Sequence, residues 1–268
     1  MGTNAYRIDD GKGFKLKSFD PDDTGEFKSR EDAEDAVKHD LKKLRELQEK
    51  FYVDRRFALL VVIQAMDTGG KDGTIDHVFS GVNPTGCHVT SFKNPSEEEL
   101  SHDYLWRVHK AAPQKGMFGI FNRSHYEDLL VVRVHDLAPK SVWEKRFEHI
   151  NQFEKMLTDE GTLIVKFFLH ISKDEQKKRL EARLEDREKL WKFNPGDLKD
   201  RELWSEYQEA YEDVIRKCGT PHAPWYVVPA NKKWYRNYIV AHVLTKVLGE
   251  LSYKLPKSHL VPSEIVVK

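Results

Sequence analysis

The feature that most constrains this chain is an apolar run that leads into a glycine-rich turn and then into a segment of helical period. Residues 57–65 are almost continuously apolar, as expected for a strand buried on both faces of a sheet. Gly69 and Gly70 follow, and the helical pattern begins directly after them. Glycine permits backbone conformations that turn consecutive N–H groups toward one point at a helix start, where anions bind. The order of strand, turn and helix therefore predicts a phosphate-binding loop.

The turn departs at two positions from the usual P-loop signature. Ala65 stands where the first glycine is usual, and Asp72 follows Lys71 where a Ser or Thr is usual. The hydroxyl that normally holds Mg²⁺ is therefore missing, and we expect Asp67, a carboxylate inside the turn, to help hold the metal. The alternative is an ordinary glycine turn between strand and helix, in which Lys71 and Asp72 are merely solvated.

Apolar runs alternate with longer segments of helical period along the rest of the chain, which predicts an α/β fold with helices on both faces of a parallel sheet. Capping residues predict helix starts after Ser29, Ser96 and Ser172. One helix is expected from about Pro139 to Gly161, and the Asn-Pro-Gly-Asp run at 194–197 predicts a break. The sheet should have about five strands, at residues 57–65, 87–92, 117–121, 163–169 and 225–228.

Length, charge and cysteine content limit the classes of protein to consider. The 268 residues fit one domain over 1–268, with an irregular N-terminal arm at about 1–28. Lys and Arg (44) balance Asp and Glu (44), so we expect no generic nucleic-acid binding, and the longest apolar stretch is too short for a membrane span. With only Cys87 and Cys218 and no export signal, a cytoplasmic location is expected.

Several separated motifs, taken in order, resemble the family-2 polyphosphate kinases. The resemblance covers most of the chain, from about Lys15 to the last helix. A set of motifs in the right order is more specific than a P-loop alone. The matching segments are Ala65-Met66-Asp67-x-x-Gly70-Lys71-Asp72, Phe92-Lys93-x-Pro95-Ser96, Trp106-Arg107, residues 119–128, residues 131–134, the segment from Lys177 to Trp191, and residues 220–230.

The resemblance implies a three-layer P-loop kinase sandwich with a helical lid at about 173–205. It also implies dependence on Mg²⁺, a homo-oligomer, and reversible transfer of the terminal phosphoryl group of inorganic polyphosphate to a nucleotide. The residue types at Asn122 and Glu127 resemble those of the subgroup that accepts both AMP and ADP, giving ADP and ATP. The expected partners are therefore polyphosphate and AMP, ADP or ATP.

The reaction brings two polyanions together, so the site is expected to be crowded with cations and N–H donors. Lys71 would hold phosphates, Arg123 would point into the crevice beyond its strand, and Asp67 would position the metal or the attacking phosphate. Asn122 stands where a metal-organising Asp is common, and Glu127 would supply a carboxylate or contact the acceptor. A structural salt bridge for Arg123 and a solvated acid for Glu127 are the plain alternatives.

Further residues are expected to contact phosphate or polyphosphate. Arg179, Arg183 and Arg187 recur every fourth residue, which places them along one helix face. The plain alternative is an exposed helix with many ion pairs, because acidic residues are interspersed there. The resemblance adds Arg133 and, on the N-terminal arm, two lysines. The full expected set is Lys15, Lys17, Gly69, Gly70, Asp72, Gly73, Arg133, Arg179, Arg183 and Arg187.

Two other functions remain open from the sequence. A nucleoside-monophosphate kinase that uses ATP as donor has the same fold and the same kind of arginine-bearing lid. A non-catalytic module that binds polyanions would use the same basic residues, with a steep salt dependence but no turnover. Donor choice separates the first alternative from a polyphosphate kinase, and turnover separates the second.

Overall fold

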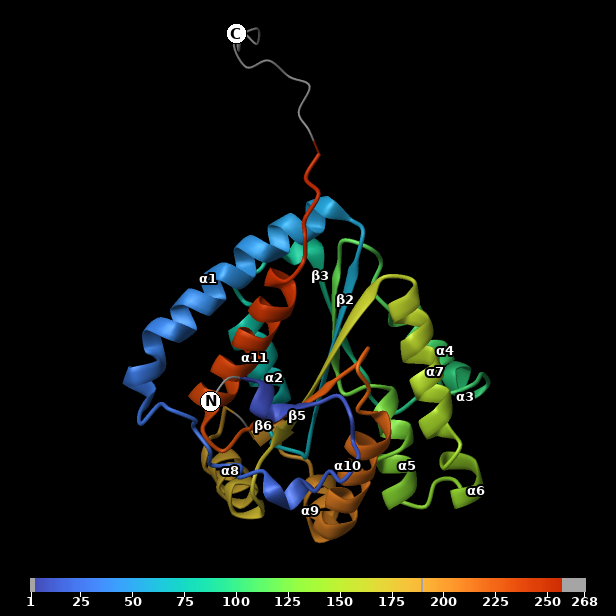
Figure 1. The fold of residues 1–268 in the computed structure, drawn as a ribbon. Helices are drawn as coiled ribbons and strands as arrows, with labels where there is room; N and C mark the ends of the chain where they lie inside the picture. Colours follow the sequence, from blue (N-terminus) through green and yellow to red (C-terminus); the bar gives the residue numbers. More distant parts are fainter. Residues whose placement is uncertain (1–2, 189, 257–268) are drawn as a thin grey trace, which may run out of the picture.

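The computed structural model describes residues 3–188 and 190–256, and its centre is a six-stranded sheet (Figure 1). Residue 189 of the predicted lid and residues 1–2 of the predicted arm lie outside this description. The strand order is β1-β6-β5-β2-β4-β3. The strands are β1 (Arg7–Ile8), β2 (Ala58–Ala65), β3 (Cys87–Ser91), β4 (Phe118–Asn122), β5 (Thr162–His170) and β6 (Trp225–Pro229).

Five of these strands are parallel and coincide with the five apolar runs of the sequence, so the α/β prediction is confirmed. The sixth, β1, pairs antiparallel with β6 through Arg7 and Ile8. Two residues are too few to give a strand pattern, which explains why the sequence did not predict it. The expectation of burial on both faces fails for β3, because it is the outer strand of the sheet and much of it is exposed.

Helices cover both faces of the sheet (Figure 1). In that view α1, α2 and α11 lie on one side, and α4 to α7 and α10 lie on the other. No helix in the described part of the chain has the length and apolarity that a membrane crossing requires. The helices are α1 (Arg30–Asp54), α2 (Lys71–Phe79), α3 (Glu97–Leu100), α4 (Trp106–Ala111), α5 (Val131–Val134), α6 (Lys140–Trp143), α7 (Arg146–Asp159), α8 (Lys173–Glu185), α9 (Gly196–Glu202), α10 (Trp204–Cys218) and α11 (Lys233–Gly249).

The capping residues predicted from the sequence begin three of these helices. The hydroxyls of Ser29, Ser96 and Ser172 each accept a hydrogen bond from the backbone N–H three residues later. The helix expected from Pro139 to Gly161 is instead two helices, α6 and α7, with a change of direction near residue 145. Short 3-10 turns complete the chain: η1 (Thr3–Tyr6), η2 (Leu16–Ser18), η3 (Pro84–Gly86), η4 (His125–Asp128) and η5 (Leu190–Lys192).

The N-terminal segment packs on the body of the protein. Phe14 and Leu16 are buried, and the hydroxyl of Tyr6 lies 2.8 Å from that of Tyr235 in α11. Asn231, just after β6, donates its backbone N–H to Pro21 O (3.1 Å). The same asparagine accepts a hydrogen bond from Ser172 N (3.0 Å), where α8 begins. The segment around Pro21 is therefore joined, through Asn231, to the start of α8.

A fully buried polar network ties the far face of the sheet to the turn η4. Lys166 of β5 donates to Glu154 of α7 (2.6 Å), to Tyr126 of η4 (2.9 Å) and to the carbonyl of Cys218 (2.7 Å). His125 also lies within hydrogen-bond distance of Glu154 (3.2 Å). Lys166 lowers the pKa of Glu154, although burial alone would raise it. An ion pair removed from water this completely is stable only because each charge has several partners.

We expect Lys166→Met to lower the free energy of unfolding by about 3–5 kcal/mol, because it leaves the Glu154 carboxylate buried without its counter-charge. Chemical denaturation measures this change. Lys155→Met, which removes a charge from the exposed face of α7, is the matched control and should change stability little. Adding Glu154→Gln to Lys166→Met should recover part of the loss. A double variant no more stable than Lys166→Met alone contradicts this account.

Candidate active site

The glycine-rich turn lies between β2 and α2 and has the conformation that the sequence predicts for a phosphate-binding loop. Gly70 is the N-cap of α2 and has φ +97°, a value that L side chains rarely adopt. A Cβ on Gly69 would lie 2.4 Å from that of Ala65. The turn thus requires glycine at both positions, and it directs the first N–H groups of α2 toward the carboxyl edge of the sheet.

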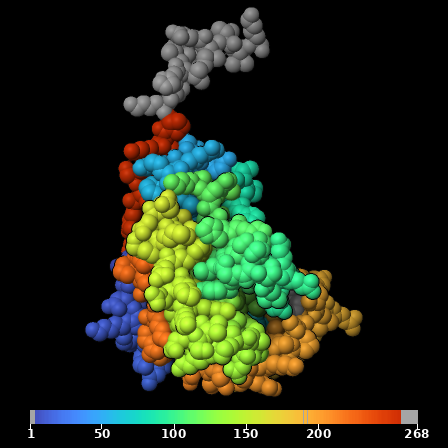
Figure 2. All heavy atoms as spheres, turned by 90° about the vertical axis from the view of Figure 1, so that its right-hand side faces the viewer, coloured from blue at the N-terminus to red at the C-terminus, as the bar shows by residue number. Residues whose placement is uncertain are grey.

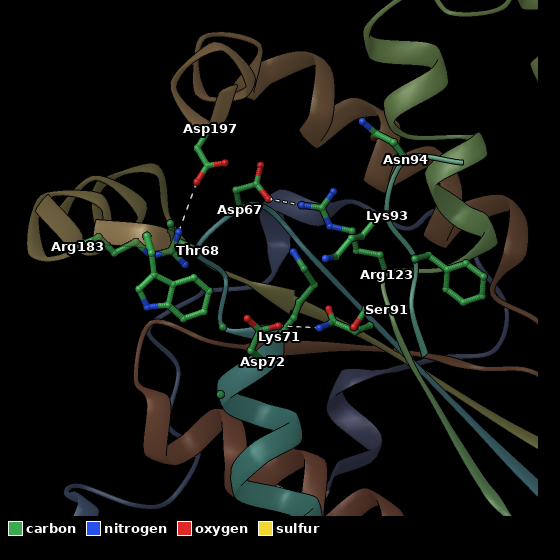
Figure 3. Close-up of a pocket in the computed structure, with 15 residues that line it drawn as sticks. Asp67, Thr68, Lys71, Asp72, Ser91, Lys93, Asn94, Arg123, Arg183 and Asp197 are labelled. Atoms are coloured by element: carbon green, nitrogen blue, oxygen red, sulfur yellow. Dashed lines mark hydrogen bonds and ion pairs between the residues drawn. The ribbon is translucent and has the colours of Figure 1, made fainter. Parts of the chain in front are cut away.

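Lys71 is the first residue of α2, and its side chain folds back over the turn (Figure 3). Its Nζ donates to the carbonyl oxygens of Ala65 (2.8 Å) and Met66 (3.4 Å). Burial and the charge of Arg123 lower the pKa of this ammonium group. The solvated lysine of the plain alternative is therefore not what the structure contains.

An ion pair joins the turn after β2 to the end of β4. Arg123 donates to Asp67 Oδ1 at 2.8 Å (Figure 3). Its guanidinium also lies 4.0 Å from Glu127. Arg123 has φ +62°, in the left-handed region that a non-glycine residue occupies at some cost. The turn η4 that follows carries Glu127, whose pKa is raised by burial against the opposing effect of Arg123. Glu127 is therefore not a solvated acid.

Asn122 and Asp72 form a second link across the same two elements. The Asn122 amide at the end of β4 donates to Asp72 Oδ1 at 2.7 Å (Figure 3). Asp72 lies in the first turn of α2, where the helix dipole favours a negative charge. Asn122 brings no charge of its own. The carboxylates at the turn and at the start of α2 are those of Asp67 and Asp72.

Two adjoining cavities open at this edge of the sheet. The first has a volume of about 810 Å³ and is lined by the P-loop, the end of β4 and the lid residues Arg183, Trp191 and Asp197. The second, of about 600 Å³, shares Asp67 and Arg123 with the first and extends past α4 and α5. In Figure 2 the segment near residue 200 lies next to the segment near residue 100, and both contribute to the second cavity. Eight of the predicted residues line the first cavity together: Asp67, Gly70, Lys71, Asp72, Gly73, Asn122, Arg123 and Arg183.

The three lid arginines do not share one environment. Arg179 is buried, and it donates to the carbonyls of Thr68 (3.1 Å) and Ala230 (2.6 Å). Arg183 lies at the first cavity, where it pairs with Asp197 of α9 at 3.4 Å (Figure 3). Arg187 follows α8 and is exposed. The equal spacing that suggested one stripe holds along the sequence, but packing on the P-loop draws Arg179 inward.

Three other predicted contacts, Arg133, Lys15 and Lys17, line neither cavity. Arg133 of α5 pairs with Asp213 of α10 at 2.7 Å. Lys15 pairs with Glu212 at 3.5 Å, and Lys17 is exposed. Gly73 lines the first cavity with Gly70, whereas Gly69 serves the shape of the turn. The structure therefore gathers the P-loop, the end of β4 and Arg183, but neither Arg133 nor the N-terminal lysines.

Sequence reasoning missed the carboxylates of α9. Asp197 is buried and faces Asp67 across the first cavity (Figure 3). Burial and the charge of Asp67 raise its pKa to about 6. The pKa of Asp200 is also raised, chiefly by burial, with Asp67 again opposing its ionisation. Asp197 ends the Asn-Pro-Gly-Asp run, and the turn signal of that run concealed an acidic residue that reaches the site.

The chain is similar to known proteins over most of its length. Residues 27–256 match the family polyphosphate kinase 2. An AMP/ADP-polyphosphate phosphotransferase of Meiothermus ruber is 55% identical over 98% of this chain and 99% of its own length. An ADP-polyphosphate phosphotransferase of Rhodopseudomonas palustris is 41% identical over 96% of this chain and 93% of its own.

Solved structures show the same fold. The crystal structure of polyphosphate kinase 2 from Arthrobacter aurescens matches with a TM-score of 0.92 and 45% identity, over 97% of this chain and 93% of that one. A structure of a polyphosphate kinase 2 from Pseudomonas aeruginosa matches with a TM-score of 0.82 and 29% identity, over 90% of this chain and 50% of that one. The three-layer fold, the P-loop and these likenesses together show that the chain belongs to the polyphosphate kinase 2 family.

Proposed function

We propose that this protein transfers the terminal phosphoryl group of inorganic polyphosphate to AMP and to ADP, and that it also catalyses the reverse reactions. The observation that carries the proposal is the cluster of Lys71, Arg123 and Arg183 around one cavity at the carboxyl edge of the sheet. Family membership and the names of the two most fully covered relatives support polyphosphate and adenine nucleotides as the substrates.

The chemistry needs positioning more than a base. A phosphate oxygen of AMP or ADP is already an anion at neutral pH, and it forms a new bond to the terminal phosphorus of polyphosphate while the bond to the next bridging oxygen breaks. Each step exchanges one phosphoanhydride for another. The barrier lies in holding two polyanions in line, which Lys71, the P-loop N–H groups and Arg123 offset by their positive charge.

The donor set suits Mg²⁺. Asp67, Asp72 and Asp197 bring hard oxygen ligands to the first cavity, which is what this ion prefers. No group of three or more acidic, His or Cys side chains in the described part of the chain already has the geometry of a metal site. Asp67 would therefore hold the ion together with substrate phosphates and water, as Mg²⁺ usually binds. When bound, Mg²⁺ neutralises phosphate charge; Asp67 itself is oriented for this by Arg123.

We further propose that the second cavity receives the acceptor and that Asn122 and Glu127 permit both AMP and ADP. Glu127 lines this cavity beside Arg123, and Asn122 lines the first cavity next to Asp72. A neutral amide in place of a carboxylate at residue 122 lowers the repulsion that phosphates in the first cavity would meet there.

Incubating the purified protein with Mg²⁺, polyphosphate and either AMP or ADP should give ADP and ATP, which chromatography detects. Lys71→Met should lower kcat by about a hundredfold or more, because it removes a positive charge from the transferring phosphates. Lys42→Met, on the exposed face of α1, is the matched control and should retain activity.

The outcomes separate the three candidate functions. Transfer from ATP to a nucleoside monophosphate, with none from polyphosphate, identifies the protein as an ordinary nucleotide kinase. Salt-sensitive binding of polyphosphate without product formation, unchanged in Lys71→Met, identifies a binding module.

Because the pKa of Asp197 is raised, replacing its carboxyl group should raise the free energy of unfolding by an amount that depends on pH. The pKa of Asp197 is about 6 in the folded protein and 3.8 in the unfolded chain. The folded state therefore holds the proton more tightly, and the free energy of unfolding falls as pH rises and Asp197 ionises. Asp197→Asn should therefore raise the free energy of unfolding by about 1–2 kcal/mol at neutral pH and above. The gain should shrink as pH falls through 6 and vanish below about pH 4.

Thermal melting across this pH range measures the effect, with Asp35→Asn on the exposed part of α1 as the control. If Asp197 serves the site, the same substitution also slows phosphoryl transfer while it stabilises the fold. A loss of stability at neutral pH, or a gain that grows toward acid pH, contradicts the assignment.

A further inference from the structure

Arg236 packs against the P-loop but lines neither cavity. It is in the first turns of α11, which packs on α2, and only 3% of the residue is exposed. Its side chain lies against the first turn of α2: a Cβ on Gly70 would fall 1.9 Å from Nη1, and a Cβ on Gly73 would fall 3.6 Å from Nη2. Gly70 and Gly73 therefore leave room for the guanidinium of Arg236 as well as for an anion at the start of α2.

The partners of Arg236 do not neutralise its charge. Nε and Nη2 both donate to the amide oxygen of Asn237, at 3.0 and 2.8 Å. Among the residues that the structure describes, none brings a carboxylate within ion-pair distance of Arg236, and none accepts a hydrogen bond from Nη1. Burial of an arginine with only a neutral partner is unusual, because a buried charge ordinarily has a counter-ion.

The surroundings of Arg236 add positive charge instead of removing it. Arg179 Nη1 would lie 3.6 Å from the same Gly70 Cβ. The start of α2 contributes the positive end of its dipole, where a cation is disfavoured. Burial and the charge of Arg179 lower the pKa of Arg236 to about 10, which still leaves the guanidinium charged at neutral pH. In the free protein these charges repel one another.

We infer that Arg236 is a positioning residue for the polyphosphate donor: it fixes Gly70 from behind, and its uncompensated charge is balanced when donor phosphates occupy the P-loop. This inference rests on the proposed function. Arg236 lines neither cavity, so it would act on the donor through Gly70 and not by direct contact. In the free protein these positive charges repel one another, and a bound polyanion relieves that repulsion. This relief contributes part of the binding free energy.

The test uses inorganic tripolyphosphate as the probe and calorimetry as the readout, with no turnover required. Arg236→Met and Arg236→Gln remove the charge, Arg236→Lys keeps it, and Arg45→Met removes an arginine from the exposed face of α1 as the matched control. Both neutral variants should bind tripolyphosphate at least about tenfold more weakly, which is the effect of one unit charge on another about 12 Å away at an effective dielectric constant of about 20. Arg236→Lys should stay within about threefold of the unmodified protein.

Two further readouts separate positioning from a merely structural role. KM for polyphosphate should rise in the neutral variants while KM for AMP changes little, because the charge faces the donor loop. The melting temperature of the ligand-free neutral variants should equal or exceed that of the unmodified protein, because the repulsion is gone. The additional stabilisation by tripolyphosphate should be smaller than in the unmodified protein.

Tripolyphosphate affinity in both neutral variants equal to that of Arg45→Met overturns the inference, as does an equal rise in both KM values. If one neutral variant fails to fold, the comparison of the other with Arg236→Lys decides the matter. If the unmodified protein neither binds tripolyphosphate nor transfers from polyphosphate, the proposed function itself fails, which is a different result.

Discussion

The repulsion between two polyanions is the constraint on which this structure depends. Parallel strands bring the start of α2, the end of β4 and the lid to one edge of the sheet, and each contributes a cation there. Positive charges this close repel one another, and they would push the three elements apart if nothing held the elements together. The Asp67–Arg123 pair supplies that restraint, because it joins two neighbouring strand ends at 2.8 Å and leaves the rest of the guanidinium to the cavity.

Rigidity below the site has an equally electrostatic origin. The turn η4 follows Arg123, and Tyr126 in that turn belongs to the buried network of Lys166 and Glu154. A purely apolar contact at this place would permit rotation of the turn. Directional hydrogen bonds to three elements fix it instead, so that the position of Glu127 is set from inside the core.

The local features of this fold are legible in the sequence, while the long-range ones are not. The parallel strands follow from apolar runs, and the P-loop from glycines whose backbone angles no other residue readily adopts. Arg179 shows the limit: its spacing from Arg183 is that of a surface stripe, yet the docking of α8 on the P-loop buries it. Asp197 lies in a run that signals only a turn, and Arg236 lies in a segment without a motif, so the role of each depends on which neighbours tertiary packing brings.

Asn231 connects three parts of the chain that are distant in sequence: the N-terminal segment, the start of α8 and the end of β6. Its contacts to Pro21 and Ser172, with the bonds of Arg179 to Thr68 and Ala230, anchor the first half of α8 to the sheet. That half of α8 is therefore fixed in position relative to the sheet. Arg201 of α9 donates to Lys173 O (2.6 Å) and to Gln176 Oε1 (3.0 Å) in the same half, so Asp197, which also lies in α9, is held to it. The shape of the crevice thus depends on the segment around Pro21, although that segment lines neither cavity.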